Sequence, residues 1–81
     1  MMTKYIATFH THLAALMTSR ALASAGVRAQ MMPVPRTLSS SCGTCVRYEA
    51  ETPQLEAMEE DVERVFRVEA GERYELLFEN E

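Results

Sequence analysis

The chain has 81 residues, of which 47 % are hydrophobic and 25 % charged, which is enough for one globular domain over residues 1–81 and excludes wholesale disorder. Its formal net charge of −4 argues against general nucleic-acid binding, which needs a dense surface of cations. No apolar run approaches the ~20 residues of a bilayer-spanning helix, so we expect a cytoplasmic protein that does not bind membranes.

The first 26 residues predict a strand followed by a helix. Residues 4–9 form a short apolar run rich in β-formers, which is typical of a central strand. Thr11 is placed to cap a helix over residues 12–25, and Gly26 supplies the left-handed residue that commonly ends one. The apolar stripe of this helix is predicted from its spacing as Leu13, Leu16, Met17, Ala21 and Ala25.

Two further strands and a long loop follow. Residues 27–32 alternate in the way of a strand with one buried face. Pro33 and Pro35 end that strand, because proline has no amide hydrogen to donate to a neighbouring strand. Residues 34–42 are the longest irregular stretch, and the alternation over residues 44–48 predicts a third strand.

The last third of the chain predicts a second helix and a final strand. Thr52-Pro53 is a typical helix start. The apolar residues that follow at helical spacing are Leu55, Met58, Val62, Val65 and Phe66. The acids of the same segment are Glu56, Glu59, Glu60, Asp61 and Glu63. We expect these acids to form a solvated helix face, with a docking surface for a basic partner or a cation site as the alternatives. Gly71 ends the segment, and residues 74, 76 and 78 alternate along the last strand.

The element order β-α-β-β-α-β predicts an α+β fold of the ferredoxin-like plait type. Such a plait is a four-stranded antiparallel sheet with both helices on one face, joined by short right-handed connections. Met32 and Leu77 are expected to point away from the helices, where they offer a contact for a homodimer.

Charge is divided sharply along the chain. The first 48 residues hold five cations and no acid, a formal charge of +5, whereas the rest holds three cations and all twelve acids, a charge of −9. Both cysteines lie in the positive part, in the segment Cys42-Gly43-Thr44-Cys45. Arg36 and Arg47 flank this segment, and nearby cations favour a thiolate over the neutral thiol. In a reducing cytosol the pattern indicates redox, sulfur-handling or metal chemistry rather than a permanent disulfide.

The spacing of the two cysteines argues against a ready disulfide. If residues 42–45 are extended, the two Cα atoms lie about 10 Å apart, whereas a disulfide needs less than about 7 Å. We therefore expect Cys45 to modulate or resolve the chemistry of Cys42. His10 and His12 would complete a zinc ligand set with both thiols, but they lack the spacing of structural zinc sites, so we predict no metal. Either imidazole is also a candidate proton acceptor for Cys42.

The segment from Pro33 to Arg47, with Pro-x-Pro-Arg followed by Ser-x-Ser-Cys-Gly, resembles the selenium/sulfur (Se/S) carrier-like family, formerly a domain of unknown function. The strand that ends in Phe9 and the helix that closes at Gly26 are similar to the family as well. The resemblance implies that Cys42 is the carrier thiol. The loop residues that it implies around this thiol are Arg36, Ser39, Ser41 and Gly43. Cys45 matches no required position of the family.

The resemblance implies a carrier that holds sulfane sulfur or selenium on Cys42. Arg36 and Arg47 would then stabilise the anion, Thr44 and the serines would contribute hydrogen bonds, and Cys45 would release the load. By analogy with other carriers, the partners are a persulfide-generating donor protein and an acceptor protein. Since no general-base triad, phosphate loop or cofactor signature is present, we expect no cofactor and no independent enzymatic turnover. The alternative is a small non-catalytic interaction module, dimeric or not, whose cysteines are incidental.

Overall fold

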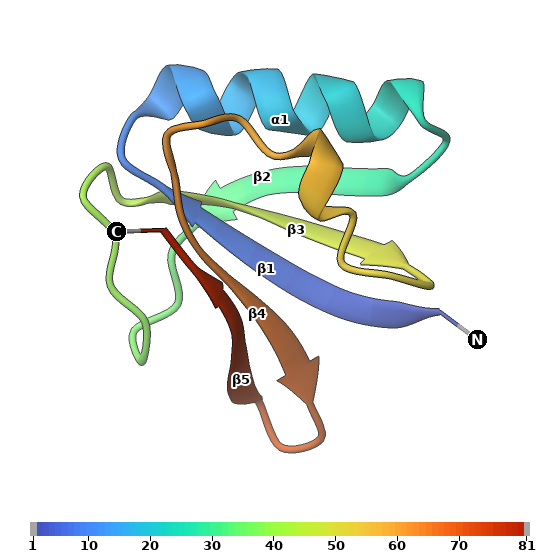
Figure 1. Cartoon of the computed structure of the whole chain (residues 1–81). Coiled ribbons are helices and arrows are strands. Elements are labelled where there is room, and N and C mark those ends of the chain that lie inside the picture. The colour runs from blue at the N-terminus through green and yellow to red at the C-terminus, as the bar shows by residue number, and fades with distance from the viewer. Residues whose placement is uncertain (1, 81) are drawn as a thin grey trace.

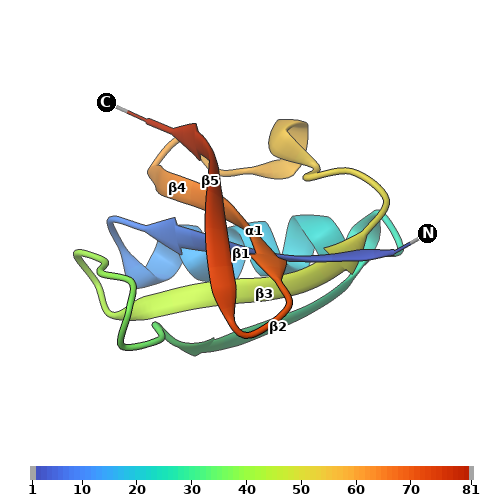
Figure 2. The ribbon, with the colours of Figure 1, turned by 90° about the horizontal axis from the view of Figure 1, so that it is seen from below.

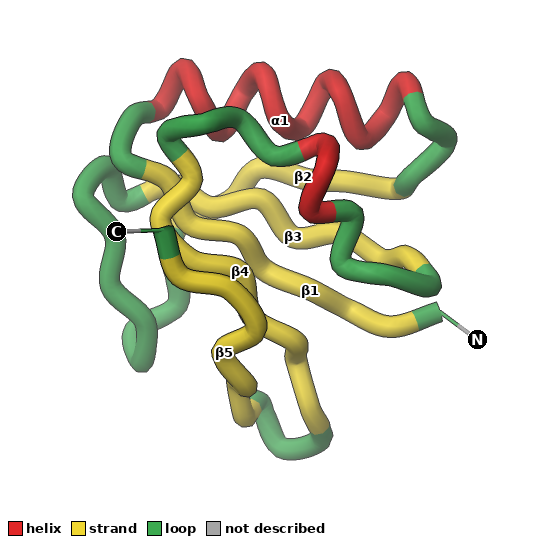
Figure 3. Tube along the Cα trace, viewed as in Figure 1, coloured by secondary structure: helices red, strands yellow, loops and turns green. Residues whose placement is uncertain are grey.

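The computed structural model describes residues 2–80. Its elements are β1 (Thr3–Phe9), α1 (His12–Ser24), β2 (Arg28–Pro33), β3 (Thr44–Ala50), the 3-10 helix η1 (Leu55–Ala57), β4 (Val62–Glu69) and β5 (Arg73–Glu79). The strands form one antiparallel sheet in the order β2-β3-β1-β4-β5, so β1 lies at its centre. Both α1 and η1 lie over the same face of this sheet (Figure 1, Figure 3). Within the described residues, no helix is long and apolar enough to cross a membrane.

The N-terminal half contains the predicted strand, helix, second strand and loop, with boundaries that differ by about one residue from the predicted ones. The Thr11 side-chain oxygen accepts a hydrogen bond from the Ala14 backbone N–H at 3.0 Å, which caps α1 as expected. Gly26 follows the helix with a φ of 80°, a left-handed conformation that glycine adopts without steric cost. β2 ends at Pro33, and the loop of residues 34–43 leads to β3.

The predicted second helix is wrong, and with it the ferredoxin-like plait of four strands and two helices. Residues 51–61 form an irregular crossover that contains only the single turn η1, and the next eight residues form strand β4. The fold therefore has five strands and one α-helix. The crossover passes over the α1 side of the sheet, where the second helix was expected (Figure 1).

One backbone angle and two features of the sequence are consistent with the observed crossover and strand and not with a helix. Gln54 has a left-handed φ of 56°, which interrupts any helix that begins at Thr52-Pro53. The acids of this segment recur three and four residues apart, and like charges at that spacing repel one another on a helix. The β-branched side chains of β4 fit a pleated strand better than a helix.

A β-bulge explains why β4 has the apolar spacing of a helix. Thr8 pairs with Arg64 and Phe9 pairs with Val62, so Glu63 is an extra residue without a partner on β1. Because of this extra residue, Val62 lies on the same face as Val65, although three positions separate them. In a sequence, apolar residues three positions apart resemble the pattern of a helix, whereas here the same spacing results from a bulge in a strand.

The predicted apolar stripe of α1 is also wrong. Leu13 and Met17 are 62 % and 48 % exposed. The side chains that face the sheet are instead Ala14, Ala15, Thr18 and Leu22. The two alanines let the helix approach the sheet closely, and the Thr18 hydroxyl accepts a hydrogen bond from the Glu59 backbone N–H at 3.0 Å. The buried face of α1 thus packs against the sheet and also binds the crossover through Thr18.

β1 is buried on both of its faces. Ala7 and Phe9 pack into the core under α1, while Ile6 and Thr8 on the opposite face are also fully buried. Figure 2 shows that the β4–β5 hairpin turns steeply across the direction of β1 and β3, as in a strongly twisted sheet. Within the described residues, the Thr8 Oγ1 atom has no hydrogen-bond partner. On the neighbouring strand β3, Val46 is buried in the core under α1, and Cys45 is buried on the opposite face next to Thr8.

Tyr48 fastens the crossover to β3, and its hydroxyl is expected to contribute measurably to stability. Its ring is buried and stacks on Tyr5 with 5.3 Å between ring centroids, and its hydroxyl donates to the Pro53 carbonyl. Tyr48→Phe leaves that carbonyl without its donor, so we expect a loss of about 1 kcal/mol in the free energy of unfolding. Urea denaturation measures this loss. Tyr74→Phe is the control, because Tyr74 is half-buried and its hydroxyl makes no hydrogen bond within residues 2–80. Equal effects of the two changes would contradict the assignment.

Candidate functional site

The loop of residues 34–43 joins β2 to β3 at one end of the sheet (Figure 3). The Val34 backbone N–H donates to the Gly43 carbonyl at 3.1 Å, which closes the base of the loop. Gly43 has a φ of 75°, and glycine accepts this left-handed conformation without strain. The Ser40 hydroxyl donates to the Phe9 carbonyl at 2.9 Å and so attaches the loop to the end of β1.

Glu63 is the main anchor of this loop. One carboxylate oxygen, Oε1, accepts the Ser41 backbone N–H at 3.1 Å, and the other, Oε2, accepts the Ser41 hydroxyl at 2.8 Å. The His10 Nδ1 atom lies 3.3 Å from Oε2. The Glu63 side chain is only 12 % exposed, and it occupies the bulge position of β4. The bulge therefore places this carboxylate against the loop next to Cys42.

The environment of Glu63 favours its ionised form. Desolvation by burial raises the pKa of this carboxyl. The hydrogen bonds donated by the Ser41 backbone and side chain, together with nearby His10, outweigh that effect and leave the pKa below its ordinary value. The anchor is consequently an ionised carboxylate at neutral pH.

Ser41, His10 and Glu63 do not have the geometry of a nucleophilic triad. A triad requires the serine on one imidazole nitrogen and the carboxylate on the other. Here the Ser41 Oγ and the Glu63 Oε2 both lie 3.3 Å from the same nitrogen, Nδ1 of His10. The Ser41 hydroxyl also donates to the carboxylate instead of to a base. The cluster holds the loop in place and does not activate the serine.

Cys42 is half-buried at the base of this loop, directly before Gly43, and packs against the core. Its thiol donates to the Thr44 carbonyl with a sulfur–oxygen distance of 3.5 Å, and the Ser40 Oγ lies 3.9 Å from the sulfur. Both imidazoles lie next to residues near Cys42. His10 Nδ1 lies 3.3 Å from Ser41 Oγ. His12 Nδ1 lies 3.4 Å from the Thr44 hydroxyl. Among residues 2–80 neither imidazole hydrogen-bonds to the sulfur itself.

Cys45 lies in a different environment from Cys42. It is a fully buried residue of β3 that pairs with Thr8, and its thiol donates to the Pro33 carbonyl at 3.8 Å. Burial raises the pKa of the Cys45 thiol to about 11, although Arg47 partly opposes the shift. Both cysteines are free thiols. The resolving role of Cys45 stays a prediction, and it would require β3 to open.

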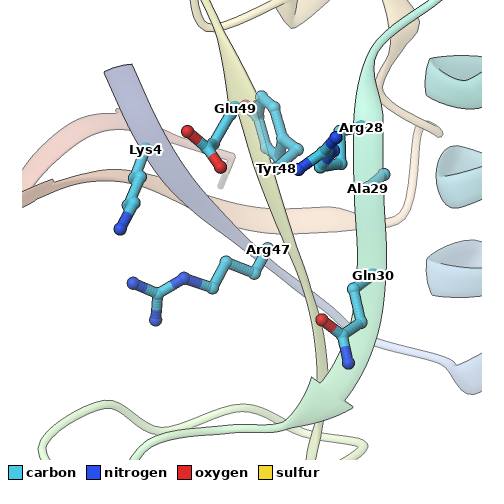
Figure 4. Close-up of a pocket in the computed structure, with 7 residues that line it drawn as sticks. All are labelled: Lys4, Arg28, Ala29, Gln30, Arg47, Tyr48 and Glu49. Carbon is cyan, nitrogen blue, oxygen red and sulfur yellow. The ribbon is translucent and has the colours of Figure 1, made fainter. Parts of the chain in front are cut away.

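Within residues 2–80, neither of the predicted arginines hydrogen-bonds to Cys42. Arg47 extends from β3 into a shallow pocket of about 160 Å³, together with Lys4, Arg28 and Gln30 (Figure 4). Arg36 is an exposed residue of the loop, as is Ser39. In the described part of the chain, no hydrogen bond joins either guanidinium to the Cys42 sulfur, and their stabilising role stays a prediction. The zinc alternative finds no support either, since no three His, Cys, Asp or Glu side chains of residues 2–80 gather as metal ligands.

Sequence reasoning missed Glu63 and Ser40 as site residues. Glu63 was assigned to the outer face of a helix, whereas it binds Ser41 across 22 residues of sequence. Its only signal was a carboxylate directly after the apolar Val62, in a segment that also fits a strand. Ser40 was recognised only as part of a serine-rich loop, yet its hydroxyl provides the contact to β1.

The Glu63 anchor is expected to weaken in acid. Because the folded protein lowers the pKa of this carboxyl below 4.5, ionised Glu63 stabilises the loop above pH 4.5. That stabilisation is lost as the pH falls through the lowered folded value. We expect the Ser41 amide signal in nuclear magnetic resonance (NMR) spectra to titrate with a midpoint below 4.5, and Glu63→Gln to abolish this titration. An amide that titrates equally in both proteins would contradict the anchor.

The chain matches a known protein family. The family model described as "Putative Se/S carrier protein-like" matches residues 4–70. The matched range contains β1 except for Thr3, together with α1, the cysteine loop and the Glu63 bulge. No curated protein and no solved structure matches the chain.

Proposed function

The chain belongs to the Se/S carrier protein-like family, and from that membership we propose that it carries sulfane sulfur or selenium on the Cys42 sulfur. The observation that carries the proposal is the contrast between the two thiols. Cys42 is half-exposed on an anchored loop, whereas Cys45 is sealed inside the sheet with a pKa of about 11. A carrier thiol must reach two protein partners, and Cys42 meets that requirement.

Loading is a thiol–persulfide exchange. The Cys42 thiol releases its proton to solvent, and the thiolate attacks the outer sulfur of a donor persulfide. A bond forms between Sγ and that sulfur, the sulfur–sulfur bond of the donor breaks, and the donor leaves as a thiolate. Unloading repeats the exchange, with an acceptor thiolate attacking the outer sulfur and Cys42 leaving as the thiolate. No external oxidant or reductant is needed, because sulfane sulfur is transferred unchanged.

The loop supplies a donor for the loaded anion. The Ser40 hydroxyl, which binds the Phe9 carbonyl, is 3.9 Å from Sγ and can exchange that bond for one to a persulfide. Ser41 stays fixed by Glu63 during this exchange. A neighbouring residue fixed by Glu63, together with a nearby hydroxyl that can rotate, suits a sulfur that is loaded and unloaded in turn.

Incubation with a small-molecule persulfide tests the proposal. Protein purified under reductant is mixed with glutathione persulfide and analysed by intact and tandem mass spectrometry, and a parallel sample receives selenide with glutathione disulfide. We expect one added sulfur or selenium atom, located on Cys42. No added atom would overturn the proposal and leave the small interaction module as the better description, and an atom found only on Cys45 would overturn the assignment to Cys42.

A further inference from the structure

A groove of about 310 Å³ lies between the crossover and the end of β5. Leu55, Met58, Val62 and Phe78 line it with apolar side chains (the floor), and Glu59 and Glu60 line it with carboxylates (the rim). Leu55 is 42 % exposed and Phe78 is 36 % exposed. Apolar side chains that gather in one depression offer a partner protein apolar area to bury on binding.

The groove is held open by hydrogen bonds that its own polar residue makes. The Asn80 side-chain amide donates to the Glu60 carbonyl at 2.9 Å and to the Val62 carbonyl at 3.0 Å. These bonds fix the end of β5 against the crossover. The shape is therefore formed before any partner arrives, which lowers the entropic cost of binding.

The charges of the lining residues indicate which kind of partner the groove binds. The residues that line it include two carboxylates and no cation, and they belong to the part of the chain that carries a formal charge of −9. A negative rim around an apolar floor repels phosphates and attracts lysine or arginine next to a large apolar side chain. The groove therefore fits a basic, apolar protein segment and not a nucleic acid.

The groove adjoins the cysteine loop through Glu63. Val62 of the floor precedes Glu63, and the Asn80 backbone N–H donates to the Glu63 carbonyl at 2.9 Å. The Glu63 carboxylate in turn binds Ser41, the neighbour of Cys42. A segment bound in the groove therefore lies next to Glu63, which binds Ser41, the residue that precedes the reactive Cys42.

We propose that this groove is the docking site of the sulfur donor or acceptor protein, which inserts a large apolar side chain flanked by lysine or arginine. The identity of this partner rests on the proposed carrier function, whereas the binding preference rests on the groove alone. The apolar side chain supplies most of the affinity, and the acidic rim orients the segment and speeds its association.

The probe is the acetylated and amidated peptide Lys-Leu-Phe-Arg-Lys, titrated into isotope-labelled protein and followed by NMR. We expect shifts centred on Leu55, Val62 and Phe78, and binding that weakens as salt is added. Leu55→Ala should weaken binding at least about fivefold, as truncation of a contact residue does. The control is Leu13→Ala, which removes an exposed leucine of α1 and should leave the affinity unchanged.

Further variants separate the contribution of charge. The double variant Glu59→Gln, Glu60→Gln should weaken binding and flatten its salt dependence, while Glu72→Gln in the β4–β5 turn should change neither. Shifts centred elsewhere, or equal binding by Leu55→Ala, would overturn the proposal. Shifts that depend on protein concentration without peptide would assign the groove to a second copy and also overturn it. Loading by glutathione persulfide does not need the groove, so a failure of docking is distinguishable from a failure of the carrier function.

Discussion

Replacing Cys42 with serine is expected to abolish sulfur loading and to leave the fold intact. A serine hydroxyl has no sulfur with which to form a persulfide, so loading falls to background. We expect the fold to tolerate the change, because the Cys42 side chain is half-buried and its two polar contacts among residues 2–80, at 3.5 and 3.9 Å, are long. We expect the free energy of unfolding to change by less than about 1 kcal/mol. Intact mass spectrometry after glutathione persulfide treatment and urea denaturation measure the two quantities.

Cys45→Ala is the matched control for this prediction. Alanine is apolar and smaller than cysteine, so at this fully buried position we expect a stability loss of about 1 kcal/mol and unchanged loading. Loading that survives in Cys42→Ser would remove Cys42 from the chemistry. Loading lost in a folded Cys45→Ala protein would instead give Cys45 a role in the exchange, as a resolving thiol has.

Local signals predicted the N-terminal half of the fold correctly. The Thr11 cap, the left-handed Gly26 and the end of β2 at Pro33 each depend on residues within a few positions along the chain. The crossover and β4 depend on distant contacts instead. Val62 and Val65 face the same side only because β1 imposes a bulge at Glu63. No local pattern reports such a bulge, and the spacing that it produces resembles that of a helix.

The site, like the fold, was predicted only where it depends on residues that are close together in the sequence. The sequence motif located the loop and its reactive candidate, because both lie in one short segment. It did not locate Glu63, whose approach to Ser41 depends on the pairing of β1 with β4. Alternation over residues 44–48 predicted the third strand but not the burial of Cys45. In the structure Cys45 is fully buried beside Thr8, its partner on β1, which is buried on the same face of the sheet.

At pH 8 we expect Cys42 to be alkylated at least about a hundredfold faster than Cys45. The thiolate is the reactive form. With a pKa of about 11, roughly one Cys45 in a thousand is ionised at that pH. The buried sulfur is in addition shielded from the reagent until β3 opens. Cys42 is half-exposed and reacts without any opening.

Iodoacetamide labelling followed by peptide mass spectrometry measures both rates in one sample. Because the deprotonated fraction rises with pH, the Cys45 rate should increase about tenfold per pH unit up to its pKa near 11. In concentrated urea the two cysteines should react at similar rates, since unfolding removes both the burial and the shift in the Cys45 pKa. Equal rates in the folded protein would mean that Cys45 is accessible, and the contrast on which the assignment of Cys42 depends would be lost. A contrast that is present in buffer and absent in urea arises from the fold, because the two residues are chemically identical.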